Sequence, residues 1–205
     1  MHERAGLLDM TSFAKYDVSG PGAEAFLDRL CANALPREGR VALTQMLTVQ
    51  GGIECDLTVT RLAPDRFYLI TAAGTETHDL AWIERHLPLD GSVVVENVTA
   101  RWGVLTIAGP RSREILEPLS DDDLSSAAFP FMAARDIRIG SVPVRALRTT
   151  YVGELGWELH HPIEYSRALY DLLIEAGGAL GLVDIGYRAL DSLRLEKGYR
   201  LWGVD

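Results

Sequence analysis

The sequence lacks the features that define several classes of protein. It has only two cysteines, Cys31 and Cys55, among 205 residues, so neither a disulfide framework nor a zinc-ligand spacing is present. It has 20 lysines and arginines against 29 aspartates and glutamates. The resulting net charge of −9 argues against a nucleic-acid-binding protein, because that function needs a basic surface.

Long apolar runs are also missing. The apolar runs that occur, such as residues 93–95, are far too short to cross a membrane. The amino terminus carries Glu3 and Arg4 and has no extended apolar core, so no secretory signal is predicted. Together with the scarcity of cysteine, this indicates a reduced, cytoplasmic setting.

Common catalytic motifs are absent as well. The sequence has no Gly-x-x-x-x-Gly-Lys-Ser/Thr loop, no Gly-x-Gly-x-x-Gly after a first strand and no Gly-x-Ser-x-Gly elbow. A nucleotide hydrolase and a flavin or nicotinamide site are therefore not supported. His160 and His161 would point to opposite faces of a strand, and His78 and His86 are expected at the surface of a helix, so no metal site is predicted.

The hydrophobic pattern that remains predicts an α+β fold. Helical spacing of apolar residues is found at 23–30, 77–87, 111–119, 163–176 and 185–197. Strands are expected at 41–48, 53–62, 67–71, 93–98, 102–108, 137–139, 142–147, 148–151 and 157–161. Residues 7–17 form a first apolar segment, and residues 180–184 are expected to be a short connector.

The sequence contains a weak internal repeat. Residues 16–21 and residues 105–110 each read as a strand that ends in Gly-Pro and precedes a helix. We interpret this as two related units of sheet and helix within one domain of residues 1–205, with a pseudo-repeat of about 1–90 and 91–205. Chance is the alternative, because Gly-Pro corners are common between strands and helices.

Residues 51–61 are the first candidate for a functional site. Two glycines allow a tight turn, and Cys55 and Leu57 then alternate with Asp56 in the period of a strand. Aspartate is a poor strand former, so its place near the start of this strand suits a carboxylate that faces a ligand. A solvent-facing residue on an edge strand is the alternative interpretation.

Residues 151–159 are the second candidate, since they combine two glycines, Tyr151, Glu154 and Glu158. On a strand, Glu158 points away from its neighbours Trp157 and Leu159. Such a carboxylate can accept two parallel hydrogen bonds from a planar edge, such as the amino-pyrimidinone of a pterin. An arginine of the protein could fill the same role.

Three motifs in this order resemble one known family. They are Gly-Gly-Ile-x-x-Asp-Leu-x-Val-Thr at 51–60, Tyr-x-Gly-Glu-x-Gly-x-Glu at 151–158 and Asp-Ser-Leu-Arg-Leu-Glu at 191–196. Together they resemble the tetrahydrofolate-binding domain of the glycine-cleavage T-protein (aminomethyltransferase) family. The segments at 8–15, 44–47 and 195–200 are similar to the folate half of dimethylglycine and sarcosine dehydrogenases and oxidases.

The resemblance implies a fold, a reaction and a set of site residues. It implies the aminomethyltransferase folate-binding fold without the usual carboxy-terminal barrel domain, and no FAD site in this chain. Asp56 matches the key acidic residue beside the reactive nitrogens of tetrahydrofolate, and Glu158 matches the residue that pairs with the pterin. Tyr151 matches an aromatic residue that lines the folate site, and Ile70 falls at an apolar position of the pterin wall. The reaction implied is one-carbon transfer from a small amine-derived donor.

Several alternatives stay open at this stage. T-proteins usually have Arg at the position of Leu190 and Asn at the position of Ala72, so two contacts of the family could be missing. The chain could accept a methylene from a separate flavin oxidoreductase subunit, or act as a folate-dependent demethylase. It could also be a folate-binding partner without catalysis or an inactive truncated homologue. The Cys-containing motif of an iron–sulfur maintenance relative is absent at 197–200.

Overall fold

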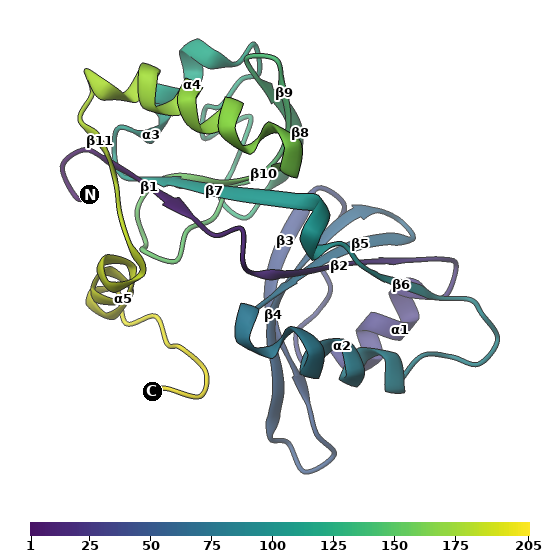
Figure 1. Ribbon diagram of the computed structural model, residues 1–205. Helices are drawn as coiled ribbons and strands as arrows, with labels where there is room; N and C mark the ends of the chain where they lie inside the picture. Colours follow the sequence, from purple (N-terminus) through teal and green to yellow (C-terminus); the bar gives the residue numbers. More distant parts are fainter. The chain divides into compact units, whose positions relative to one another are not determined.

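The computed structural model describes residues 1–205, and the chain divides into two compact units. Ser12–Ala100 forms one of them, which we call the inserted unit. Met1–Thr11 and Arg101–Asp205 form the other, which we call the flanking unit because its two segments flank the first in sequence. Each unit is described by itself below, and Figure 1 labels their elements.

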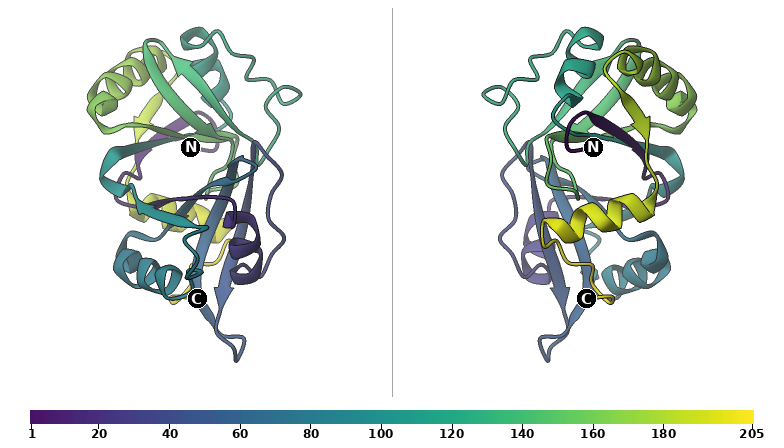
Figure 2. Two further views of the ribbon diagram at one scale, coloured as in Figure 1. Left: turned by 90° about the vertical axis from the view of Figure 1, so that its right-hand side faces the viewer. Right: turned by 90° about the vertical axis from the view of Figure 1, so that its left-hand side faces the viewer.

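The inserted unit is an antiparallel sheet with two helices. Its elements are β2 (Ala14–Ser19), α1 (Ala23–Leu30), β3 (Arg40–Leu47), β4 (Ile53–Ala63), β5 (Arg66–Thr71), α2 (Glu76–Arg85) and β6 (Val94–Asn97). The five strands lie in the order β3-β4-β5-β2-β6. The β3–β4 hairpin ends in a turn at residues 48–52 that projects beyond the rest of this unit (Figure 2).

One face of this sheet forms the core of the inserted unit. Leu57 and Val59 of β4 are buried with Phe26 and Leu27 of α1 and with Ile83 of α2. Because side chains alternate along a strand, the residues between these positions point to the other face of the sheet. The face away from the helices is therefore the one that carries Asp56.

The flanking unit has a mixed sheet and three helices. Its elements are β1 (Ala5–Asp9), β7 (Trp102–Ala108), α3 (Ser112–Leu116), β8 (Ala134–Ile139), β9 (Val142–Leu147), β10 (Gly156–Pro162), α4 (Ser166–Gly178), β11 (Leu182–Asp184) and α5 (Tyr187–Glu196). The six strands lie in the order β11-β1-β7-β10-β9-β8, and only β1 and β11 pair in parallel. Trp157 and Leu159 of β10 are buried with Leu169 and Leu173 of α4.

The two units share one order of elements. Strand, helix, three strands, helix and strand follow one another from β2 to β6 and again from β7 to β11, and the strand orders agree except that β1 lies between β7 and β11. The Gly-Pro corners are equivalent too: Gly20 and Gly109 have φ of +118° and +127°. A Cβ there would lie 2.4 Å from the Ser92 carbonyl oxygen or 2.2 Å from that of Arg4. These correspondences favour a duplication, which stays a proposal.

Two expectations for local structure, at 180–184 and 148–151, were wrong, and a third segment is divided between two strands. The expected connector 180–184 contains β11, a strand that pairs with β1 from the far end of the sequence. The first apolar segment, 7–17, is divided between β1 and β2, which belong to different units. No strand forms at 148–151, where the chain makes turns before β10. In each case the pairing partner, rather than the local pattern, decides the structure.

None of the helices combines the length and the apolar character that crossing a bilayer requires.

Candidate functional site

Asp56 lies on β4, between β3 and β5, as the alternation predicts. Its neighbours Cys55 and Leu57 are buried in the core of the inserted unit, and its own side chain is partly buried on the opposite face. Asp56 faces Gln45 of β3, whose Nε2 donates a hydrogen bond of 2.7 Å to Oδ1 of the carboxylate. The carboxylate is therefore held in place through one oxygen, which leaves the second oxygen outside this bond.

Ile70 lies on the same face as Asp56. It is directly opposite Thr58 of β4 on one side and opposite Lys15 of β2 on the other, and directly opposed residues share a face. Ile70 is 8% exposed and Lys15 is fully buried, with its Nζ donating 2.9 Å to the Phe13 carbonyl oxygen. The structure thus brings an apolar side chain and an ammonium group onto the sheet face that carries Asp56.

Glu158 lies in the middle of β10, between β7 and β9. It is opposite Thr106 and Leu147, on the face of the sheet away from α4. Its side chain is 16% exposed, and its Oε2 is 3.4 Å from Nε2 of His160, which is almost completely buried. The side chain beside Glu158 is thus an imidazole. A carboxylate with this exposure retains acceptor positions for a planar pair of donors.

The adjacent histidines point to opposite faces of β10, as predicted. His160 approaches Glu158, whereas His161 lies on the side of α4, where its Nδ1 donates 2.9 Å to the Leu159 carbonyl oxygen and its Nε2 is 2.9 Å from Ser166 Oγ. They cannot chelate one ion together. His160 is therefore a neighbour of Glu158 rather than a partner of His161.

Tyr151 lies in the loop between β9 and β10. Its ring stacks on Tyr199, with centroids 5.9 Å apart and planes at 24°, and its hydroxyl donates to the Arg200 carbonyl oxygen. A cavity of about 370 Å³ adjoins this loop. It is lined by Phe131, Arg148, Thr149, Thr150, Gly153, Glu154, Leu155, Gly156 and Tyr199. An aromatic pair at the edge of an open cavity can stack on a planar ligand.

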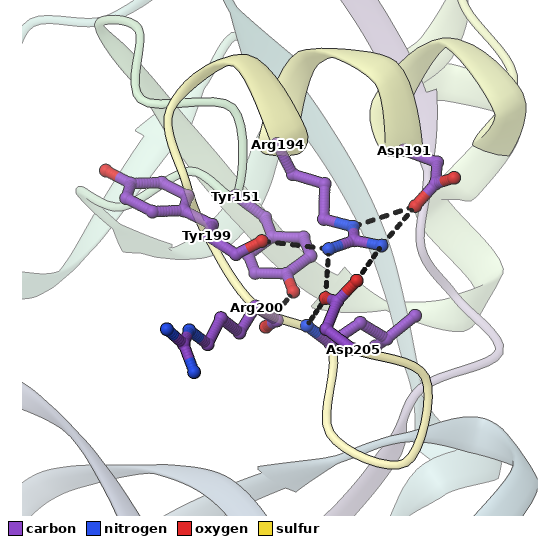
Figure 3. A network of polar contacts seen from close by, with 7 residues as sticks. Tyr151, Asp191, Arg194, Tyr199, Arg200 and Asp205 are labelled. Atoms are coloured by element: carbon purple, nitrogen blue, oxygen red, sulfur yellow. Dashed lines mark hydrogen bonds and ion pairs between the residues drawn. The ribbon is translucent and has the colours of Figure 1, made fainter.

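A buried arginine holds the segment that carries Tyr199 (Figure 3). Nε of Arg194 donates 2.7 Å to Asp191 Oδ1, and Nη1 donates 2.9 Å to the Tyr199 carbonyl oxygen. Its guanidinium also pairs with Asp205, whose carboxylate accepts a 2.7 Å bond from the Leu201 backbone. Asp191 and Arg194 belong to the third motif, and the structure gives that motif a positioning role for the aromatic pair.

Glu154 lies in the same loop between β9 and β10 and is a second carboxylate near Tyr151 in sequence. Burial alone would raise the pKa of Glu154, but the hydrogen bond from His2 and the charge of Lys197 outweigh it and hold the pKa of Glu154 below its usual range. The same hydrogen bond, with that to Glu196, raises the pKa of His2. Glu154 is thus an ionised partner within the protein, whereas Glu158 is the freer of the two carboxylates.

The four predicted site residues are divided between the units. Asp56 and Ile70 share a sheet face in the inserted unit, whereas Tyr151 and Glu158 belong to the flanking unit. Sequence reasoning gave no role to Gln45 or Lys15. The position of the β3–β4 turn could have predicted the contact of Gln45 with Asp56, because the turn fixes which residue of β3 is opposite Asp56.

Comparison with known proteins identifies the family. The family described as "GCVT N-terminal domain" matches residues 1–205. Mitochondrial dimethylglycine dehydrogenase of Rattus norvegicus is 42% identical over 204 residues, which are 99% of this chain and 24% of that protein. Aminomethyltransferase of Chloroherpeton thalassium is 33% identical over 207 residues, 100% of this chain and 56% of that protein. The glycine cleavage system aminomethyltransferase T from Bartonella henselae superposes with a TM-score of 0.84 at 30% identity, over 98% of this chain and 53% of that one.

The fold is that of an aminomethyltransferase T-protein. The chain belongs to the GCVT N-terminal domain family, as the three motifs predicted. It spans 24% of the length of the dehydrogenase relatives that it matches.

Proposed function

We propose that this chain binds tetrahydrofolate and carries out one-carbon transfer to it. The donor would be the methylene released when a dimethylglycine- or sarcosine-type amine is oxidised by a separate flavin oxidoreductase subunit. The observation that carries the proposal is the Asp56 carboxylate, oriented by Gln45 on a sheet face in a chain of the GCVT family. The relatives support it, since one is a dimethylglycine dehydrogenase and another an aminomethyltransferase.

The residues present fit a reduced folate in their chemistry. A pterin ring offers adjacent N–H donors, and Glu158 supplies a partly exposed carboxylate that can accept them in parallel. Ile70 supplies an apolar wall, and Tyr151 with Tyr199 supplies a stacked aromatic surface. Tetrahydrofolate supplies the nucleophilic nitrogen that accepts the one-carbon unit.

The proposed role of Asp56 is electrostatic and acid–base. When a folate nitrogen attacks an iminium carbon, positive charge develops at that attacking nitrogen. A carboxylate close by stabilises this charge. The same carboxylate can then accept the proton that nitrogen loses. The amide of Gln45 keeps one oxygen of Asp56 fixed, so the other can be directed at the reacting nitrogen. No metal or protein nucleophile is required in this scheme.

Folate binding is tested by calorimetry with reduced tetrahydrofolate. We expect Glu158→Gln to weaken binding by at least about tenfold, because a hydrogen bond to a charged group contributes roughly 1.5–3 kcal/mol. Glu164→Gln, an exposed glutamate just after β10, is the matched control and should bind like the unaltered chain. A folded chain that does not bind tetrahydrofolate, or equal binding by both variants, would refute the proposed pocket.

Transfer is tested by following methylenetetrahydrofolate while a flavin dehydrogenase oxidises dimethylglycine. We expect Asp56→Asn to lower the rate by about 10²–10⁴, the usual contribution of an acid–base residue, and to leave folate binding within a few-fold. Asp65→Asn, in the β4–β5 turn, is the control of equal chemistry. Folate binding without any transfer by the unaltered chain would instead favour a non-catalytic folate-binding subunit.

A further inference from the structure

We propose that the inserted unit contains a binding site for a divalent transition-metal ion, Zn²⁺ by its donor chemistry, formed by Cys55, His78 and Asp79. The ligand atoms of these three side chains all lie within 4.8 Å of one another. Cys55 comes from β4, and His78 and Asp79 come from α2, which packs on that strand (Figure 1). One ion could therefore contact all three after small side-chain movements.

Burial distinguishes this cluster from a surface group of acidic residues. Cys55 is fully buried, and Asp79 is only 1% exposed. The side chain of His78 is half exposed, so it has room to adjust and it leaves an entry path to the other two. Burying a carboxylate is costly unless its charge is compensated, and a cation bound here would add to the hydrogen bond that Thr75 donates to Asp79.

The histidine is oriented as a metal ligand would be. Its Nδ1 is 3.0 Å from Asp79 Oδ1, and its Nε2 is 3.1 Å from Glu54 Oε1. Histidine ligands usually bind the ion through one nitrogen and donate the other N–H to a carboxylate. In the proposed complex, Nδ1 would bind the ion and Nε2–H would donate a hydrogen bond to Glu54. Thr75 Oγ1 donates 2.7 Å to Asp79 Oδ2 and leaves Oδ1 for the ion.

The donor set favours zinc over the hard cations. Calcium and magnesium prefer oxygen ligands, whereas a sulfur, an imidazole nitrogen and a carboxylate oxygen form a set that tetrahedral Zn²⁺ accepts. Three protein ligands leave the fourth position to water. The ion would fix α2 to β4, the strand that carries Asp56 on its other face, so its role is to stiffen this strand rather than to react.

The test is a zinc titration of the whole chain, first stripped of metal with a chelator. We expect one ion per chain by calorimetry and a higher melting temperature with the ion bound. With Co²⁺ as the probe, a thiolate-to-metal absorption band should appear, because Cys55 binds as the thiolate. His78→Asn should weaken binding by at least about tenfold, since even outer partners of a metal site alter affinity by ~10–100-fold.

The controls separate the site from general effects. His86→Asn alters another histidine of the same helix region and should bind zinc unchanged, as should Cys31→Ser, which alters the other buried cysteine. Cys55→Ser should lose the Co²⁺ thiolate band. The side chain of His78 is half exposed, so we expect the protein to fold when it is replaced. If Cys55→Ser does not fold, zinc binding by His78→Asn alone tests the site. Absence of a one-to-one complex, or binding that survives His78→Asn, would refute the site and leave a hydrogen-bond network around Asp79.

Discussion

Gln45 and Asp56 oppose each other across β3 and β4, and the proposed reaction depends on how firmly the amide holds the carboxylate. We expect Gln45→Ala to lower the rate of transfer about tenfold, because a hydrogen bond to a charged group contributes roughly 1.5–3 kcal/mol. Folate affinity and melting temperature should change little, which distinguishes positioning from structural damage. Steady-state kinetics compare this variant with Gln50→Ala, in the exposed turn of the same hairpin. Equal loss of rate in both would contradict the role of Gln45.

His2 gives the flanking unit a pH-dependent contact. Its two ring nitrogens each lie 2.9 Å from a carboxylate oxygen, of Glu154 and of Glu196, and these hydrogen bonds raise the pKa of His2 above 6.5. Protonated His2 therefore contributes stability that is fully present below that ordinary value and is lost as the pH rises through the higher folded pKa.

Urea unfolding of the unaltered chain and of His2→Gln measures this contribution. The unaltered chain should be the more stable at about pH 6, and the difference should shrink toward about pH 8 as His2 loses its proton. Glu196→Gln removes the negative charge of one partner of His2 and should reduce the difference at the lower pH. A stability difference that does not vary with pH would show that His2 is not protonated in this contact.

At the scale of elements, the end of α4 offers two adjacent glycines in different surroundings. A Cβ on Gly177 would lie 2.5 Å from two side-chain atoms of Leu182 in β11, whereas a Cβ on Gly178 would meet nothing within 4 Å. We expect Gly177→Ala to destabilise the protein by about 1–3 kcal/mol, as overpacking does. Gly178→Ala should stabilise it by up to about 1 kcal/mol, because alanine loses less backbone entropy. Thermal unfolding of the two variants checks the opposite signs, and a loss of stability in both would show that helix termination, not packing, requires the glycines.

The elements also show which parts of the fold the sequence could predict. The alternation of Cys55, Asp56 and Leu57 was sufficient to place Asp56 on a strand, facing away from the core, and the helical spacing located α1, α2, α4 and α5. The short strand β11 could not be found, since its three residues hold no period and its partner is β1. The cluster of Cys55 with His78 and Asp79 was missed for a similar reason. Cys55 and His78 are 23 residues apart in the sequence, and only the packing of α2 on β4 brings them together, so no local sequence pattern predicts the cluster.

At the scale of the whole molecule, charge limits the partners. With a net charge of −9, the chain should not be retained by duplex DNA, because binding to phosphates requires a basic surface that displaces counterions. A gel-shift titration at low salt, with a basic protein of similar size as the positive control, checks this expectation. Salt-sensitive retention of the chain would point to a basic patch that the total charge conceals.

The path of the chain through the two units has a consequence for biosynthesis. The inserted unit is complete once β6 has been made at residue 97, whereas the sheet of the flanking unit needs β1 from the start of the chain and β11, which ends at residue 184. During translation, β1 therefore remains unpaired while the inserted unit emerges from the ribosome and folds. Both partners of β1, β7 and β11, are made only after the inserted unit, so a nascent chain stalled before β7 would contain one finished unit and an unpaired β1.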